Sequence, residues 1–453
     1  MIVPGTCPGR RYNSDSEVIM DDRIFRGANY AAELQPPEVY RGRRERLAAA
    51  VGRGTVVFWG AGDERGYGDV GTFRQDSTFF YLTGVELPNA VLVLRPAEEF
   101  EALFLPARKP ALERWTGPKW GPGEKAATAL GFDRVLALEA GEIEIEARRR
   151  PVPGFEERLH AWLSEPEAEL WTELPPVGTG QELPFPHRFV AGLRDRLPSF
   201  AVRDASEAVA NLRVIKDEGE IALMRRAIAA TIAGHRRAAA MIRPGVREGA
   251  VEGAVYGAFR EAGAEGVAFP SIVGSGFAST VLHYDQNVGT LCAGDLVVVD
   301  IGARYGYYCG DLTRTYPVSG RFTDRQRAVY ELVLAAHDAV AAAIRPGATL
   351  GELRKIAYDV IESSDLTDDN GEHLGQYFIH GIGHFLGLDA HDSGGEDPEL
   401  APGMVVTNEP GIYIPDEALG IRIEDDFLVT PDGAENLSRE LPDDVASLEA
   451  MVG

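Results

Sequence analysis

Four carboxylates in the C-terminal part of the sequence stand at or near the ends of apolar segments. Asp300 follows the run 296–299, whose four apolar residues include three that are β-branched, which predicts a buried strand that ends on Asp300. Asp311 comes eleven residues later, after a stretch rich in Gly and Tyr, and Glu409 ends a second apolar strand before a Pro-Gly pair. An unpaired buried charge is costly, so these acids require either solvent or a counter-charge.

Histidines concentrate in the same part of the chain. Five of the nine lie within residues 337–391, and the densest group is the segment "HGIGHFLGLDAHD" with His380, His384 and His391. His380 and His384 are four residues apart and therefore share a face of either a helix or a strand. The glycines between them disfavour a helix and let the backbone approach a ligand closely. One such histidine alone is more often structural, but three together favour a functional site.

The segment "GIRIEDDFLVT", residues 420–430, alternates in polarity as a strand does. Ile421 and Ile423 face one way, and Arg422 and Glu424 face the other. Two interpretations stay open at this point. The segment is either an edge strand with a salt bridge in solvent, or a strand that directs both polar side chains into a cavity.

Taken together, these residues form a set of metal ligands. The set consists of four carboxylates and one imidazole: Asp300, Asp311, Glu409, Glu424 and His384. Four carboxylates carry four negative charges, which two divalent cations balance. A hydroxide that bridges the two cations would be an additional ligand that can be gained or lost. Such a site suits Mn²⁺ or Co²⁺ and, less distinctively, Zn²⁺. It contains no thiolate, which argues against a structural zinc site.

The same segments resemble a known family. They are "LHYDQN" (282–287), "DLVVVDIGARYGYYCGDLTRTYPVSGRFT" (295–323), the histidine segment 380–392, "VVTNEPGIYI" (405–414) and 420–430. In this order they resemble the pita-bread dinuclear metallopeptidases, and among them the aminopeptidase P family, over residues 212–441. Residues 73–94, "FRQDSTFFYLTGVELPNAVLVL", are similar to the N-terminal domain of the same family.

The resemblance implies a role for each ligand. Asp300 matches the bidentate ligand of one metal, and Asp311 and Glu424 match the bridging carboxylates. His384 and Glu409 match the ligands of the second metal, and Glu409 also matches the residue that carries a proton from water to the leaving nitrogen.

Five further positions are implied to contact the substrate or the ligands. His283 and His391 match histidines that position the substrate and stabilise the tetrahedral intermediate. His380 and Arg422 match substrate-orienting positions, and Tyr413 matches a tyrosine of the pocket.

The activity implied is release of the N-terminal residue from peptides with proline in second position. The bond before proline resists ordinary peptidases because it lacks an N–H and has a fixed φ. The nearest alternative is a prolidase that cleaves Xaa-Pro dipeptides with the same ligands, and the N-terminal segment 73–94 favours the aminopeptidase. Metal-independent creatinase-like hydrolysis and a non-enzymatic binding module are further alternatives, and the intact ligand set argues against both.

The 453 residues predict two domains of an α/β (α+β) protein. We expect an N-terminal arm (1–35), an α/β domain (36–203) with strands at 54–62, 89–96 and 101–107, a linker (204–216) and a pita-bread catalytic domain (217–453). Asp217 and Glu220 form the pattern of a capping box at the start of a long helix. The order helix, "RPG", helix occurs twice, as expected for two related halves.

Composition narrows the choice of partners. The formal net charge of −25 argues against nucleic acid and anionic membranes, and no apolar run reaches about 18 residues. Three cysteines without a CxxC spacing and an N-terminus without an apolar signal segment predict a cytoplasmic protein. The resemblance also implies a homodimer or homotetramer, in which Trp115 of "ERWTG" would reach a neighbouring active site.

Overall fold

The computed structural model describes residues 35–62, 73–145, 148–197, 199–395 and 397–452. The predicted arm, residues 1–35, lies outside them apart from Gln35. The N-terminal part contains a six-stranded sheet of order β4-β3-β2-β1-β7-β8. Its strands are β1 (Thr55–Trp59), β2 (Val91–Arg95), β3 (Phe100–Leu105), β4 (Val135–Ala137), β7 (Glu169–Thr172) and β8 (Ala201–Asp204). The three strands predicted from the sequence in this part are therefore confirmed.

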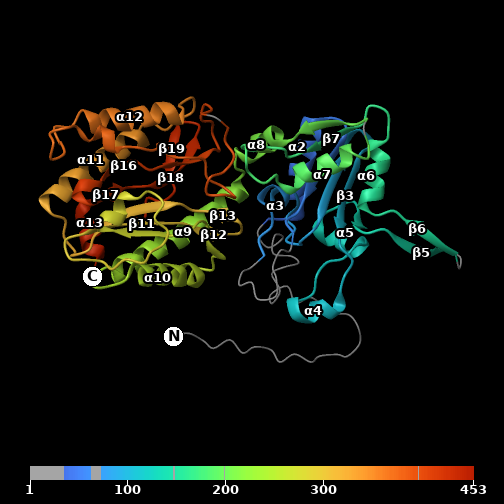
Figure 1. The fold of residues 1–453 in the computed structure, drawn as a ribbon, viewed down its shortest axis with the longest axis horizontal. Helices are drawn as coiled ribbons and strands as arrows, with labels where there is room; N and C mark the ends of the chain where they lie inside the picture. Colours follow the sequence, from blue (N-terminus) through green and yellow to red (C-terminus); the bar gives the residue numbers. More distant parts are fainter. Residues whose placement is uncertain (1–34, 63–72, 146–147, 198, 396, 453) are drawn as a thin grey trace.

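Helices flank this sheet, one of them, α4 (Pro110–Thr116), stands away from it, and a separate two-stranded ribbon projects to the side (Figure 1). The helices are α2 (Pro37–Val51), α3 (Ser77–Thr83), α4 (Pro110–Thr116), α5 (Glu124–Leu130), α6 (Phe155–Leu163), α7 (Phe185–Arg194) and α8 (Ser206–Arg213). The ribbon pairs β5 (Gly141–Ile145) with β6 (Arg148–Val152). The segment around Phe80, between β1 and β2, forms α3, whose seven residues are all buried.

The C-terminal part holds two pairs of helices with strands between them (Figure 1). The helices are α9 (Glu218–Met241), α10 (Glu248–Glu261), α11 (Asp324–Ala341), α12 (Leu350–Glu362) and the terminal α13 (Val445–Met451). The strands are β9 (Gly266–Val267), β10 (Ile272–Ser275), β11 (Leu296–Ile301), β12 (Ala303–Tyr305), β13 (Tyr308–Cys309), β14 (Leu312–Pro317), β15 (Val405–Asn408), β16 (Gly411–Ile414), β17 (Leu419–Arg422), β18 (Asp425–Thr430) and β19 (Gly433–Asn436). Each helix pair is joined through an "RPG" sequence, as the repeated tripeptide predicted.

The long helix α9 begins where the sequence predicted. The Asp217 side chain accepts from the Glu220 backbone N–H at 2.8 Å, and the Glu220 carboxylate accepts from the Asp217 N–H at 2.9 Å. This reciprocal capping satisfies two N–H groups that the helix itself leaves unpaired. At the other end, Gly245 of "RPG" has a φ of 86°, in the left-handed region that glycine tolerates.

Strand β11 pairs with both β10 and β14 and forms the buried centre of its sheet. It continues one residue beyond Asp300, to Ile301, so the prediction that the strand ends on Asp300 is wrong by one position. The Gly- and Tyr-rich stretch that follows is a small hairpin, β12–β13, which turns at Gly306 and Tyr307 with φ of 58° and 73°. Asp300 lies opposite Thr313 in the register with β14, two residues beyond Asp311.

The segment 420–430 is two strands and not one. Strand β17 ends at Arg422 and pairs with β16, whereas β18 begins at Asp425 and pairs with β15. Between them, Glu424 forms an isolated backbone bridge with Thr313. The solvent-exposed alternative is excluded because the side chains of Arg422 and Glu424 are buried.

The two parts of the chain contact each other through the β12–β13 turn. The Tyr307 ring stacks on Phe80 of α3 with 3.7 Å between ring centroids. The Tyr307 hydroxyl donates to Glu86 at 2.6 Å and accepts from the Gln75 backbone N–H at 3.0 Å. The C-terminal part of the chain is thereby fixed against α3 and the residues next to it in the N-terminal part.

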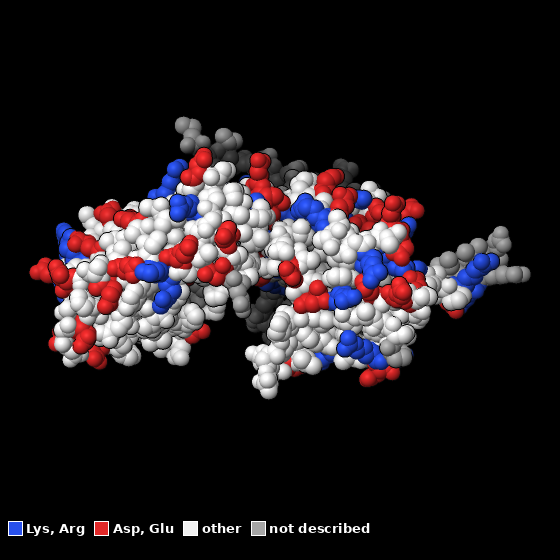
Figure 2. All heavy atoms as spheres, turned by 90° about the horizontal axis from the view of Figure 1, so that it is seen from above, with Lys and Arg blue, Asp and Glu red and all other residues white. Residues whose placement is uncertain are grey.

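The surface is acidic overall, with 70 Asp and Glu against 45 Lys and Arg. Figure 2 shows both signs spread over the face seen from above, without a continuous basic band among its described residues. Within the described residues, no helix is both long enough and apolar enough to cross a membrane.

A buried histidine on α9 provides a test of the packing around β14. The two ring nitrogens of His235 lie 3.1 Å from the Tyr316 hydroxyl and 3.0 Å from the Leu312 carbonyl oxygen. Burial lowers the pKa of His235 to about 3. The unfolded chain therefore binds a proton that the folded chain does not, and stability is lost as the pH falls below the unfolded pKa of about 6.5.

We predict that His235→Gln weakens this pH dependence. Between pH 7.5 and 5.5 the wild-type protein should lose about 1.4 kcal/mol more unfolding free energy than the variant, because the variant has no imidazole to protonate. Urea titrations at the two pH values measure the difference. An equal loss in both proteins would show that His235 is not held neutral.

Candidate metal centre

A cavity of about 610 Å³ lies in the C-terminal part of the chain. Nine of the ten predicted site residues line it: Asp300, Asp311, His384, Glu409, Glu424, His283, His380, His391 and Arg422. The tenth, Tyr413, does not line the cavity, but its hydroxyl contacts two residues that do, Arg422 and His380. Residues that are far apart in the sequence therefore meet in one place.

Each potential ligand is placed by a strand or by the loop next to it. Asp300 is on β11, and Asp311 directly precedes β14. Glu409 directly follows β15, and Glu424 lies at the junction of β17 and β18. His384 is in the loop before β15, where its backbone N–H donates to the Thr407 hydroxyl at 3.0 Å.

The side-chain donors are close enough to share a cation. One potential ligand atom from each of Asp311, His384 and Glu424 lies within 4.8 Å of the others. The His384 Nε2 atom is 3.6 Å from Asp311 Oδ2 and 3.6 Å from Glu409 Oε1. The Nδ1 atom of the same ring is 3.1 Å from the Phe385 carbonyl oxygen. A bond from Nδ1–H to that carbonyl would leave Nε2 as the lone-pair donor that faces the carboxylates.

Arg422 connects the carboxylates to the substrate-binding residues predicted from the resemblance. Its Nη2 donates to Asp300 Oδ2 at 2.6 Å, and its Nη1 donates to the Tyr413 hydroxyl at 2.8 Å. That hydroxyl lies 2.9 Å from His380 Nε2. Arg422, Tyr413 and His380 thus form a chain of hydrogen bonds that begins at Asp300.

Thr313 is a site residue that the sequence reasoning missed. Its hydroxyl donates to Glu424 Oε2 at 2.7 Å and lies 3.3 Å from Arg422 Nε as an acceptor. The signal was available, because Thr313 follows Asp311 by two positions and a strand directs such residues to the same face. Its hydroxyl fixes the orientation of the Glu424 carboxylate.

Burial, together with the charges of neighbouring carboxylates, raises the pKa values of three carboxyl groups in this cavity, those of Asp311, Glu409 and Glu424. Burial, followed by the charges of neighbouring carboxylates, raises the pKa of Asp311 and of Glu424 well above the usual range. Burial likewise raises the pKa of Glu409 to about 7, although the Arg422 guanidinium opposes this. The protein alone thus lacks enough positive charge to keep all these groups ionised.

The pKa values of three histidines of the cavity are shifted in the opposite direction. Burial lowers the pKa of His384, and burial with the nearby His384 lowers the pKa of His391. Burial and the Arg422 charge lower the pKa of His380 to about 4. All three are therefore neutral at pH 7, the form in which an imidazole can bind a metal or accept a proton.

The donor set fits divalent cations. Oxygen donors predominate, one neutral imidazole is present, and no cysteine lines the cavity among the described residues. The Asp300 Oδ1 atom is buried and has no hydrogen-bond partner within the described part of the chain. A buried, unpartnered carboxylate oxygen requires a cation or a donor, so this atom is available as a ligand.

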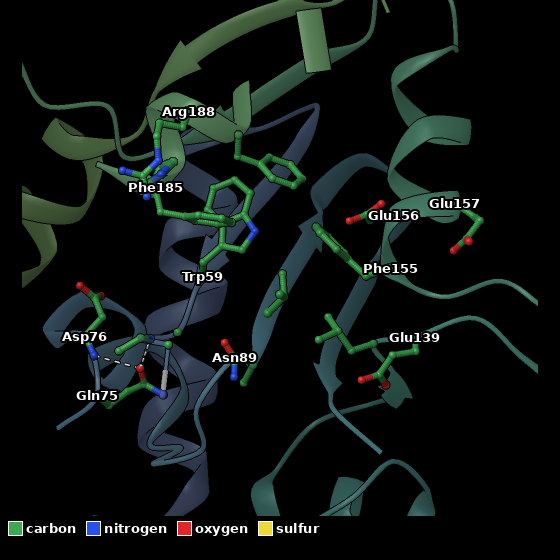
Figure 3. A pocket seen from close by; sticks show the side chains of 18 of the residues that line it. Trp59, Gln75, Asp76, Asn89, Glu139, Phe155, Glu156, Glu157, Phe185 and Arg188 are labelled. Atoms are coloured by element: carbon green, nitrogen blue, oxygen red, sulfur yellow. Dashed lines mark hydrogen bonds between the residues drawn. The ribbon is translucent and has the colours of Figure 1, made fainter. Parts of the chain in front are cut away.

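A larger hollow, of about 850 Å³, lies in the N-terminal part (Figure 3). Trp59 and Phe155 form part of its wall, and Glu139, Glu156 and Glu157 lie along one side. Neither histidine nor cysteine occurs among its described lining residues. The larger hollow therefore lacks the imidazole that completes the ligand set of the smaller cavity.

Comparison with known proteins gives two matching family models. Residues 222–431 match the model of metallopeptidase family M24, and residues 40–147 match that of the aminopeptidase P N-terminal domain. The chain is 32% identical to the Xaa-Pro aminopeptidase of Haemophilus influenzae, over 93% of this chain and 99% of that protein. It is 35% identical to the Xaa-Pro aminopeptidase of Escherichia coli, over 84% of this chain and 89% of that protein.

The fold also matches solved structures. Proline aminopeptidase P II from Yersinia pestis superposes with a TM-score of 0.79 at 32% sequence identity, covering 92% of this chain and 99% of that one. The predicted fold class, an N-terminal α/β domain followed by a metallopeptidase domain, is thereby confirmed.

Metal binding should stabilise the folded protein. After treatment with a chelator, adding Mn²⁺ at about 100 times its dissociation constant should raise the unfolding free energy by about 2.7 kcal/mol. We expect the variant Asp311→Asn/Glu424→Gln to lose this increase and to be at least as stable as the wild type without metal, because repulsion between buried carboxylates is removed. Thermal unfolding with and without Mn²⁺ measures both effects. An equal increase in the unfolding free energy of the double variant would contradict the assignment of these ligands. The surface variant Glu435→Gln serves as the control and should be stabilised by Mn²⁺ as the wild type is.

Proposed function

The chain belongs to the aminopeptidase P family of the M24 metallopeptidases, and from this we propose that its carboxylate-rich cavity removes the N-terminal residue from peptides with proline in second position. The observation that supports this most directly is the convergence of four carboxylates and His384 on one cavity. The match of residues 40–147 to the N-terminal domain of aminopeptidase P favours this activity over that of a prolidase.

We propose that five residues of the cavity are the metal ligands and would hold two divalent cations. They are Asp300, Asp311, His384, Glu409 and Glu424. Mn²⁺ is our first choice, and Co²⁺ or Zn²⁺ also suit this set of donors. When bound, such cations supply Lewis acidity, which activates water and polarises the scissile carbonyl group. The protein's own groups then bind and orient the peptide and move the protons.

Glu409 is the proposed proton carrier. Its carboxylate lines the cavity, and Oε1 lies 3.4 Å from the Thr407 hydroxyl, which orients it as a hydrogen-bond donor. A carboxylate in this position accepts the proton of the attacking water and transfers it to the proline nitrogen as the bond breaks. That nitrogen has no hydrogen of its own in the peptide, so it must receive a proton to leave.

The histidines around the cavity are the proposed substrate contacts. His283 and His391 line the cavity together with the metal ligands, and we assign them to stabilising the oxygen that becomes negative in the tetrahedral intermediate. His380 and Tyr413, connected to Arg422 as described above, orient the peptide. The apolar part of the lining, Phe269, Pro270, Ile272 and Leu282, suits a proline ring.

We propose that the protein acts as a homodimer or homotetramer and that Trp115 contributes to a neighbouring subunit. In the structure, the Trp115 residue on α4 is 85% exposed, which is unusual for so large an apolar side chain.

We also propose the domain boundaries 36–203, 204–216 and 217–453, and a cytoplasmic location. Support for the location comes from Cys292 and Cys309, which are both free thiols.

Glu409→Ala should lower the rate of hydrolysis of an Xaa-Pro-Yaa tripeptide by a factor of about 10³ or more. The substitution removes a ligand and the proton carrier together. Liquid chromatography of the released amino acid measures the rate, and Glu435→Ala is the surface control. Full activity of the variant with bound metal would contradict the assignment.

A comparison of two substrates with the wild-type protein tests the alternative activity. Turnover of an Xaa-Pro dipeptide in preference to the tripeptide would identify a prolidase.

Trp115→Ala should lower kcat/KM for the tripeptide at least about tenfold while leaving the thermal unfolding temperature unchanged, because the side chain makes little contact within its own subunit. Sedimentation velocity reports the oligomeric state at the concentration of the assay. Unchanged kinetics in a protein that is oligomeric at that concentration would remove Trp115 from the site.

A further inference from the structure

The loop that carries His391 is folded tightly on itself. The Asp392 backbone N–H donates to the Phe385 carbonyl oxygen at 2.9 Å, and the Gly387 N–H donates to the Asp389 carbonyl oxygen at 3.2 Å. A Cβ atom at Gly387 would overlap the Asp392 carboxylate, so only glycine permits this packing. The His384 and His391 rings, at either end of the turn, lie with centroids 4.2 Å apart.

Two aspartates flank His391 and point away from the metal cavity. Neither Asp389 nor Asp392 lines that cavity, and the Asp392 side chain is only 2% exposed. A carboxylate buried to this extent requires a partner of opposite charge. Both aspartates find such partners in the segment that joins the two parts of the chain and in the N-terminal part itself.

Arg213, the last residue of α8, binds both aspartates with one nitrogen atom. Its Nη2 donates to Asp389 Oδ2 at 2.8 Å and to Asp392 Oδ1 at 2.5 Å. Its Nη1 donates to the Thr78 hydroxyl of α3 at 3.1 Å. The Arg213 side chain is 7% exposed, so these charge-assisted bonds are largely shielded from water.

Further groups complete the contact from the same side. Lys216 Nζ lies 3.1 Å from Asp392 Oδ2. Arg74, just before α3, donates to Asp389 Oδ1 at 2.9 Å and to the Leu388 carbonyl oxygen at 3.0 Å. The Ser77 hydroxyl donates to Asp389 Oδ1 at 2.8 Å. Three cations thus face two carboxylates, and none of the three lines the metal cavity.

We propose that Arg213 is a positioning residue for His391. Through Asp389 and Asp392 it holds the loop in the conformation that directs the imidazole at the substrate. This inference rests on the proposed function, because it assigns to the linker and the N-terminal part a role in the same peptidase site. Arg213 itself does not line the cavity.

The geometry explains why arginine is needed here. The guanidinium holds the two carboxylates with Nη2 and the Thr78 hydroxyl with Nη1, and the single nitrogen of a lysine ammonium group cannot occupy both positions. Without Arg213, Asp389 keeps Arg74 and Asp392 keeps Lys216, but the one cation that bridges the two carboxylates and ties both of them to Thr78 is lost. The turn would then be held less tightly. A displacement of about 1 Å in a catalytic group can reduce the rate about 10²-fold.

A double-mutant cycle tests whether Arg213 acts through His391. Arg213→Met should lower kcat for an Xaa-Pro-Yaa peptide about 30- to 100-fold with a smaller change in KM, and Arg213→Lys should recover part of the loss. In a His391→Ala background the same Arg213→Met change should cost less than about threefold, because the residue being positioned is gone. The exposed pair of Arg225 with Glu435, 2.7 Å apart, provides the control variant Arg225→Met, which should match wild type.

Equal losses in the two backgrounds would overturn the proposal, since Arg213 would then act independently of His391. Hydrogen–deuterium exchange of the metal-free protein adds a measurement that does not depend on activity. Arg213→Met should speed exchange of the amides in 385–395 at least about tenfold, whereas Arg225→Met should not, and unchanged exchange would also overturn it. A wild-type protein that cleaves no Xaa-Pro peptide would refute the proposed function alone, because the exchange result would still decide whether Arg213 holds the loop.

Discussion

The concentration of negative charge in one buried cavity is the constraint on which the rest of the structure depends. The four carboxylates that are potential ligands converge there with one guanidinium, Arg422, among them. Thr313 is where the surrounding strands meet: it lies opposite Asp300 in the β11–β14 register and forms a backbone bridge with Glu424. One residue therefore sets the relative position of two potential ligands from separate sheets. This arrangement holds the carboxylates close together despite their mutual repulsion, which adds to burial in raising the pKa values of Asp311 and Glu424.

The same strands carry a second buried charge pair on their opposite face. Arg314 follows Thr313, and Asp425 follows Glu424, so alternation directs both away from the cavity. Arg314 Nη2 contacts the two Asp425 oxygens at 2.8 and 3.0 Å, and His337 of α11 lies 3.2 Å from Asp425 Oδ2. Here the carboxylate has its counter-charge within the protein, and the pKa of Asp425 is lowered. A slip of one residue would exchange the two faces, so both charge sets specify the same register.

Much of this could be predicted from the sequence, because strands, caps and acidic strand ends are local patterns. The helix start at Asp217 and the convergence of the predicted site residues are examples. The division of residues 420–430 into two strands could not be predicted, because the polarity pattern continues through the break while the pairing partners change from β16 to β15. The contacts of Arg213 could not be predicted from local patterns either, because its partners lie more than 130 residues away along the chain in either direction.

These long-range contacts give the N-terminal part a physical connection to the chemistry. Its sheet does not line the metal cavity, yet α3 and the residues just before it hold the His391 loop through Arg74 and Ser77. The Phe80–Tyr307 stack fixes the hairpin between β11 and β14 from the same helix. The His391 loop and the hairpin that connects Asp300 to Asp311 are therefore both anchored to one short helix in the N-terminal part of the chain. A part of the chain that contributes no potential ligand can in this way influence the geometry of a site whose potential ligands all come from the other part.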